Sequence, residues 1–244
     1  MAEPLERSPI PPSAAQLDYD DGEPLESARH RQQMTVLIES LEFAWQKRDD
    51  FYVGGNMFLY FSETQSRRND FRGPDVFVVL NTTRRERLSW IVWEENGQAP
   101  DVIIELLSDK TEHVDRGEKM RIYGRTLKVG EYFLFDPFSG VLEGYELDVL
   151  RGRYVPKLPD SEGRLRCEQL GLYLAKLRST LYAVDTSWLR WLDDTGKLLE
   201  LPIERANAEV ERANAEAERA NAEAERAERL EAELLALKAK QSGG

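Results

Sequence analysis

The chain has 244 residues, a net charge of −12, 41% hydrophobic residues and one cysteine. This length predicts one medium-sized domain with extensions, and the single Cys167 excludes an intramolecular disulfide. We find neither a signal-peptide core nor an apolar run near the roughly 18 residues of a spanning helix, which favours a cytoplasmic protein that does not contact the membrane.

The first predicted elements occupy the N-terminal half of the chain. Residues 1–26 are rich in proline and acidic residues, which predicts a disordered arm. Residues 30–48 predict a helix, because apolar residues recur there at spacings of three and four. Four short apolar segments separated by polar turns predict strands, at 56–62, 73–80, 88–95 and 100–108.

The elements that follow complete the predicted domain. Residues 115–127 predict a second helix, and EYFLFDP at 131–137 predicts another buried strand. Residues 141–158 predict a hairpin that turns near Arg151 and Gly152, whereas 170–181 fit a strand with a short helix. This order predicts a mixed α/β domain over 27–185, with a central sheet flanked by helices.

A connector at 186–203 is expected to lead into a different kind of segment at 204–240. ERANAEV, ERANAEA, ERANAEA and ERAERLE are consecutive heptads whose small apolar residues alternate in steps of four and three, which predicts a coiled coil and a homo-oligomer. Arg and Glu pairs at i,i+3 and i,i+4 would also support a solitary helix, and both interpretations stay open.

The charge distribution bears on possible partners. An acidic protein has no general electrostatic attraction for nucleic acid, so DNA binding requires a local basic patch. Six arginines between Arg67 and Arg87 reverse the local sign of charge; they are Arg67, Arg68, Arg72, Arg84, Arg85 and Arg87. The alternative is an ordinary solvated loop between strands.

Two carboxylates stand inside apolar strand segments. Glu105 lies within PDVIIELLS and Asp75 within GPDVFVVL. A buried carboxylate requires a nearby cation or lysine. If the two strands are sheet neighbours, their backbones lie about 4.8 Å apart and both acids can hold one divalent cation. Two acids, a lysine and Mg²⁺ form an arrangement that cleaves phosphodiesters. A structural carboxylate paired with lysine is the alternative.

The blocks GPDVFVV, WEENGQAPDVIIELLSDKT and DRGEKMRIYGRTLKVGEYFLFDP resemble the Uma2 family of restriction-endonuclease-like proteins, within the PD-(D/E)xK nuclease superfamily. The resemblance runs from about His30 to Tyr182. It implies an αβββαβ restriction-endonuclease-like core, DNA cleavage dependent on Mg²⁺ (or Mn²⁺), and metal ligands at Asp75 and Glu105. Our hypothesis adds the main-chain carbonyl of Leu106 as a further ligand.

The chain departs from the superfamily pattern at one position. The pattern places lysine two residues after the second acid, where this chain has Leu107. We expect Lys119, on the following helix, to supply the catalytic ammonium, while Lys110 is closer in sequence but falls in a loop. The same departure supports an alternative function, a non-catalytic nuclease-fold module that binds DNA or a protein.

Other polar residues are assigned structural roles. Asp101 and Asp136 are expected in turns at strand ends, and the isolated His30 and His113 do not predict a zinc site. Further residues are expected to face solvent on the first helix (Glu39, Glu42) or to pack in the core (Tyr60, Trp90, Tyr123).

Overall fold

The computed structural model describes residues 11–13, 17, 27–62 and 73–242. It divides into two compact units, one ending at Leu199 and one beginning at Glu200. The first unit contains a six-stranded mixed sheet in the order β1-β3-β5-β6-β7-β8. Its strands are β1 (Phe51–Gly54), β3 (Val76–Leu80), β5 (Val102–Leu106), β6 (Glu131–Phe135), β7 (Leu142–Asp148) and β8 (Arg153–Pro156). The predicted mixed α/β fold is confirmed.

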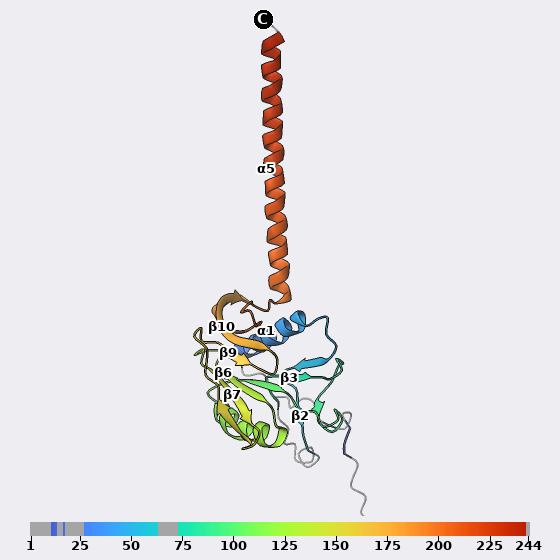
Figure 1. Ribbon diagram of the computed structural model, residues 1–244, viewed down its shortest axis with the longest axis vertical. Helices are drawn as coiled ribbons and strands as arrows, with labels where there is room; N and C mark the ends of the chain where they lie inside the picture. Colours follow the sequence, from blue (N-terminus) through green and yellow to red (C-terminus); the bar gives the residue numbers. More distant parts are fainter. Residues whose placement is uncertain (1–10, 14–16, 18–26, 63–72, 243–244) are drawn as a thin grey trace, which may run out of the picture. The chain divides into compact units, whose positions relative to one another are not determined.

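Helix α1 (Ala28–Ala44) covers one face of this sheet together with a three-stranded sheet, β11-β10-β9. The strands are β9 (Leu165–Cys167), β10 (Leu172–Leu181) and β11 (Val184–Leu192). Gln33 fixes α1 to β11, because its side chain donates to the carbonyl of Leu189 at 2.9 Å and accepts from the same residue's N–H at 3.0 Å. Figure 1 shows α1 beside β9 and β10.

A helical segment between β5 and β6 covers the opposite face and forms the crossover that a parallel strand pair requires. It consists of short alternating turns: α3 (Glu112–Val114), the π-helical η2 (Asp115–Lys119), α4 (Met120–Ile122) and the π-helical η3 (Tyr123–Leu127). Alternation along β5 separates two cores, with Ile104 on the α1 side and Ile103 on the side of the helical segment. Glu105 shares the side of Ile103.

Several predicted elements differ from the structure. Segments 56–62 and 88–95 contain only the short strands β2 (Leu59–Tyr60) and β4 (Trp90–Ile91), which pair with each other outside the central sheet. Residues 170–181 are almost entirely β10, without the short helix. Residues 186–203, expected as a connector, include most of β11, which pairs with β10 over its whole length and contacts α1.

The second unit is the helix α5 (Pro202–Ser242), 41 residues long. It includes the whole heptad segment, and the side chains described from Glu211 to Leu230 are exposed along it. Among the described residues, we find no helix that combines the length and apolar character needed to cross a lipid bilayer.

Candidate active site

Asp75 and Glu105 lie opposite each other on neighbouring strands. β3 and β5 pair antiparallel, with Val76 opposite Ile104, so Asp75, just before β3, faces Glu105. The N–H of Asp75 donates to Glu105 Oε2 at 3.2 Å, and the N–H of Leu106 donates to Asp75 Oδ2 at 2.7 Å. These reciprocal bonds hold both carboxylates at one end of the strand pair. The condition set by the sequence, that the two strands are neighbours in the sheet, is therefore met.

Lys119 reaches the same place from the helical segment. Its Nζ lies 3.1 Å from Glu105 Oε2 and 2.8 Å from Asp115 Oδ1, and its side chain is only 18% exposed. Lys110 is exposed in the loop after β5. The structure therefore brings Asp75, Glu105 and Lys119 together, although the lysine comes from a different element than the superfamily pattern specifies.

The helical segment presents a stripe of three polar side chains to the carboxylates. Asp115, Lys119 and Tyr123 are spaced by four residues, and the Tyr123 hydroxyl donates to Glu105 Oε1 at 2.9 Å. Segments of π-helix are rare and are often found at functional sites. Here the widened turns η2 and η3 contain all three of these residues, and the side chains of all three reach the buried carboxylate cluster.

Burial and mutual repulsion set the protonation of this cluster. Burial raises the pKa of Glu105 to about 8; Lys119 opposes the rise, and Asp75 and Asp115 add to it. Burial likewise raises the pKa of Asp75. Burial alone would lower the pKa of Lys119, but Glu105 and Asp115 raise it above its ordinary value. Lys119 is therefore a cation at neutral pH, while the carboxylates resist being charged together.

The donor set fits a hard divalent cation. Asp75, Glu105 and Asp115 bring three carboxyl groups to one buried place, against the single ammonium of Lys119. Burial raises the pKa values of Asp75 and Glu105, so a divalent cation between these two groups would offset the cost of ionising both. Within the described ranges, no three His, Cys, Asp or Glu side chains form a complete metal-binding group. Mg²⁺ typically uses one or two carboxylates and completes its shell with waters and substrate phosphate. Asp75 and Glu105 would hold Mg²⁺ only with waters and substrate phosphate completing its shell.

Comparison with known proteins places this chain in a family. A family model described as "Putative restriction endonuclease", Uma2, matches residues 2–175. The chain belongs to the Uma2 family. A similar solved structure is a "putative nuclease belonging to DUF820" from Anabaena variabilis, with 15% identity, a TM-score of 0.43, and coverage of 66% of this chain and 86% of that chain. None of the curated proteins matches the chain.

The sequence did not predict that three further residues lie near Asp75 and Glu105 in this Uma2 protein. Asp115 and Tyr123 lie four residues on either side of Lys119, and this spacing was a usable signal. His30 gave no signal, because it lies far away in the sequence. Its Nε2 is 3.1 Å from the carbonyl oxygen of Leu107, and its Nδ1 is 2.8 Å from the hydroxyl of Ser27, the N-cap of α1.

The expected turn residues have structural roles. Asp101 Oδ2 accepts the N–H of Leu80 at 2.7 Å, which joins the start of β5 to the end of β3. Asp136 Oδ1 accepts the N–H groups of Phe138 and Ser139 in the turn after β6. Both assignments as turn or strand-end residues are confirmed.

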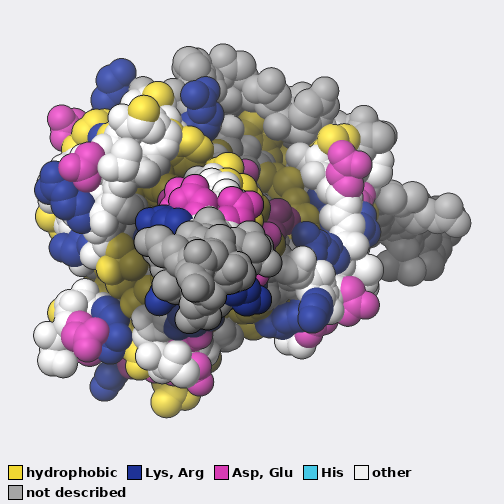
Figure 2. All heavy atoms as spheres, turned by 90° about the horizontal axis from the view of Figure 1, so that it is seen from above, with side chains coloured by type: hydrophobic (Ala, Val, Ile, Leu, Met, Phe, Trp, Pro, Cys, Tyr) yellow, Lys and Arg dark blue, Asp and Glu magenta, His cyan; other side chains and the backbone are white. Residues whose placement is uncertain are grey.

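The described part of the arginine patch does not lie at the carboxylates. Arg84, Arg85 and Arg87 follow β3, whereas Asp75 precedes it, so they lie at opposite ends of the strand. Arg87 is buried and binds Glu95 at 2.7 Å. The arginines at 67, 68 and 72 fall outside the described residues. Figure 2 shows acidic and basic side chains interspersed on one face of the molecule.

Proposed function

We propose that this Uma2 protein is a Mg²⁺-dependent (or Mn²⁺-dependent) endonuclease that hydrolyses DNA phosphodiester bonds. The observation that carries the proposal is the position of Lys119 Nζ, 3.1 Å from Glu105 Oε2, at the site where Asp75 and Glu105 are joined by hydrogen bonds. Two acids and a lysine on one spot supply the charges that phosphodiester hydrolysis requires, and family membership supports the same class of reaction.

Each residue has a distinct role in the proposed reaction. Asp75, Glu105 and the Leu106 carbonyl would hold the metal, which when bound polarises the phosphate and lowers the pKa of an attacking water. Lys119 places a fixed positive charge where negative charge develops on the phosphate oxygens. Asp115 holds Lys119 in place, and the Tyr123 hydroxyl orients the Glu105 carboxylate.

Cleavage of DNA by the purified full-length chain tests the proposal. Supercoiled plasmid and labelled oligonucleotides are incubated with Mg²⁺, Mn²⁺ or EDTA, and RNA of the same sequence identifies the preferred nucleic acid. We expect Asp75→Asn, Glu105→Gln and Lys119→Ala each to reduce the rate by about 10²-fold or more. Lys176→Ala is the control and retains activity, because Lys176 is exposed on β10, away from the carboxylates. Equal cleavage by all variants would indicate a contaminating nuclease.

A non-catalytic module is the second candidate function, and Leu107 at the usual lysine position favours it. Calorimetric titration with Mg²⁺ and Mn²⁺ separates the two candidates. Metal binding that is lost in Glu105→Gln supports the enzyme. Metal binding that is absent or unchanged, together with retained DNA binding, supports the module.

We also propose that α5 forms a coiled coil with α5 of a second copy. The heptad seam contains Ala217 and Ala220, while Ala215 and Ala222 lie on the opposite face of the helix. In sedimentation experiments, we expect the double variant Ala217→Lys, Ala220→Lys to be monomeric. The control double variant Ala215→Lys, Ala222→Lys, on the opposite face of the helix, should remain oligomeric. Monomeric wild-type protein at all concentrations would refute this pairing.

A further inference from the structure

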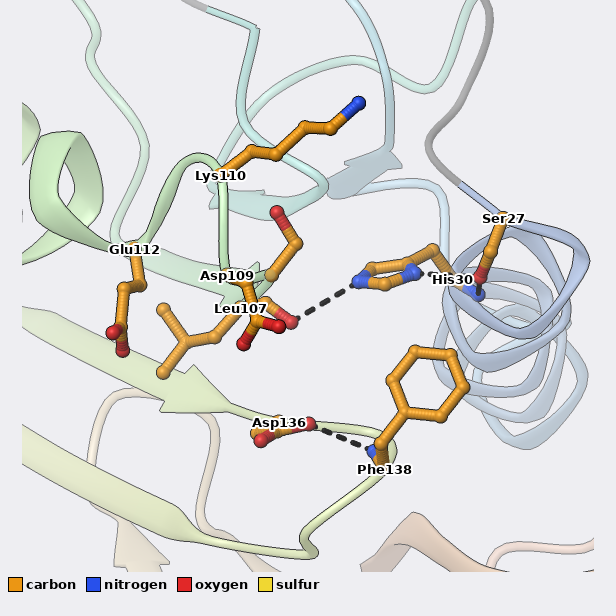
Figure 3. Close-up of a pocket in the computed structure, with 9 residues that line it drawn as sticks. Ser27, His30, Leu107, Asp109, Lys110, Glu112, Asp136 and Phe138 are labelled. Carbon is orange, nitrogen blue, oxygen red and sulfur yellow. Dashed lines mark hydrogen bonds between the residues drawn. The ribbon is translucent and has the colours of Figure 1, made fainter.

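A separate pocket opens at the end of β5, beside the carboxylate cluster. The cavity has a volume of about 320 Å³ and is lined by residues that include His30, Leu107, Asp109, Asp136 and Phe138. This volume falls at the lower end of the range of about 300–1,000 Å³ that is typical of small-ligand sites. We refer to it as the β5 pocket (Figure 3).

The β5 pocket lies at the end of β5 that carries Glu105. Leu107, in its wall, follows Glu105 by two residues and accepts a hydrogen bond from His30 at 3.1 Å. A nucleotide whose phosphate reached Asp75 and Glu105 would therefore have its neighbouring base close to this pocket.

One side of the β5 pocket is aromatic. Phe138 is 67% exposed, yet its ring lies 5.7 Å from the His30 ring, and the Arg29 guanidinium lies 5.7 Å from its centroid. Arg29 is itself held by the hydroxyl of Thr186 at 3.1 Å. The Phe138 ring is thus supported from behind while a face stays accessible. Exposed aromatic rings in nucleic-acid-binding proteins stack unpaired bases.

The other side of the β5 pocket carries acceptors. Figure 3 shows the carboxylates of Asp109 and Asp136 across the pocket from the His30 and Phe138 rings, while the Lys110 amino group points away. Carboxylates repel phosphate, but they accept hydrogen bonds from the exocyclic amino groups of bases. An aromatic face opposite carboxylate oxygens therefore suits a base better than it suits a second phosphate.

We propose that the β5 pocket receives one unpaired nucleobase that carries an exocyclic amino group, from the nucleotide next to the scissile phosphate. This rests on the proposed nuclease function and deepens it, because it names the substrate class as strands with an unpaired adenine, guanine or cytosine. Phe138 stacks on the base, and Asp109 accepts from its amino group.

Binding measured without cleavage tests the pocket. The probes are labelled duplexes that share one sequence and differ at one bulged position, which holds adenine, thymine or an abasic site. Fluorescence anisotropy is recorded with Mg²⁺ present on full-length protein carrying Lys119→Ala, which is expected to slow cleavage while both proposed metal ligands, Asp75 and Glu105, are retained. Because one stacked base contributes about 5-fold to 150-fold in affinity, we expect the bulged adenine to bind tighter than the abasic probe by a factor in that range.

Two variants locate the preference in the pocket. Phe138→Ala removes the preference for adenine over the abasic site and leaves abasic binding unchanged, whereas Asp109→Ala, which deletes the acceptor, removes the preference for adenine over thymine. Leu158→Ala is the control, because Leu158 is equally apolar and 88% exposed but does not line the pocket. A preference that survives Phe138→Ala, or equal binding of all three probes, overturns the proposal.

Failure of the base pocket and failure of the nuclease proposal give different experimental results. If the wild-type chain does not cut DNA but the Phe138-dependent preference is present, the nuclease proposal fails and the base pocket stands. If the wild-type chain cuts DNA and Phe138→Ala has no effect on binding or on cleavage at the bulge, the base pocket fails and the nuclease proposal stands.

Discussion

Glu105 should make the stability of the metal-free protein depend on pH in an unusual direction. Burial, Asp75 and Asp115 raise its pKa from an ordinary value of 4.5 to about 8, against the opposing effect of Lys119. Between these two values, the folded state holds a proton that the unfolded chain has released. The stability contributed by Glu105 is thus fully present below pH 4.5 and is lost as the pH rises through 8.

Glu105→Gln removes this dependence, because an amide does not titrate in this range. In the window between the two pKa values, the wild-type protein loses about 1.4 kcal/mol per pH unit relative to the variant. At pH 5 the two proteins should agree within about 1 kcal/mol, since a protonated carboxyl and an amide both offer a donor and an acceptor. At pH 8 the variant should be the more stable by about 4 kcal/mol.

Urea unfolding at several pH values, followed by tryptophan fluorescence in EDTA, measures this difference. All tryptophans lie in the first unit, so the signal does not report on α5. Stability curves of the two proteins that run parallel from pH 5 to 8 would show that Glu105 is ionised throughout and would refute the reasoning. Adding Mg²⁺ at pH 8 should stabilise the wild type and leave Glu105→Gln almost unchanged, because the ionised carboxylate is the proposed ligand.

Two further changes probe the support of the carboxylates. Tyr123→Phe removes the donor to Glu105 and should raise the Mg²⁺ concentration for half-maximal cleavage by about 10-fold to 100-fold. Tyr145→Phe should not, because the hydroxyl of this half-buried tyrosine donates to Glu143 instead. Gly55→Ala would place a Cβ 2.4 Å from the carbonyl oxygen of Asp75, so it should cost about 1–3 kcal/mol in urea unfolding and reduce cleavage. Gly117→Ala meets nothing within 4 Å and serves as its control; an equal effect of both alanines would contradict this explanation.

The carboxylate pair was predictable because its signal is local. Asp75 and Glu105 each interrupt an apolar strand, and alternation along the strand assigns the side of the sheet. Lys119 was predictable as well, since a helix that follows the strand and crosses the sheet can reach the same point. The pairing of β3 with β5 then brings the three together.

Other parts of the site depend on contacts between distant segments. Tyr123 was assigned to the core, and by area it is a core residue, but its hydroxyl ends at Glu105. The period of an apolar stripe does not distinguish these two roles. His30 lies on α1, which Gln33 fixes to β11, and its ring contacts Leu107 after β5. These contacts join residues far apart in the sequence, so no local pattern predicts them. β11 was missed because its second half, from Trp188 to Leu192, is buried at every position and includes the charged Arg190, so polar and apolar residues do not alternate there.

Because Lys119 on the helical segment places the ammonium beside Glu105, position 107 does not need a lysine. Leu107 instead packs in the hydrophobic core, in the same cluster as Ile122. A sequence search that requires lysine two residues after the second acid would classify this chain as inactive, because Leu107 stands there. A search for three charged atoms in space, regardless of which element carries them, would retain it and other chains in which the lysine has changed its place.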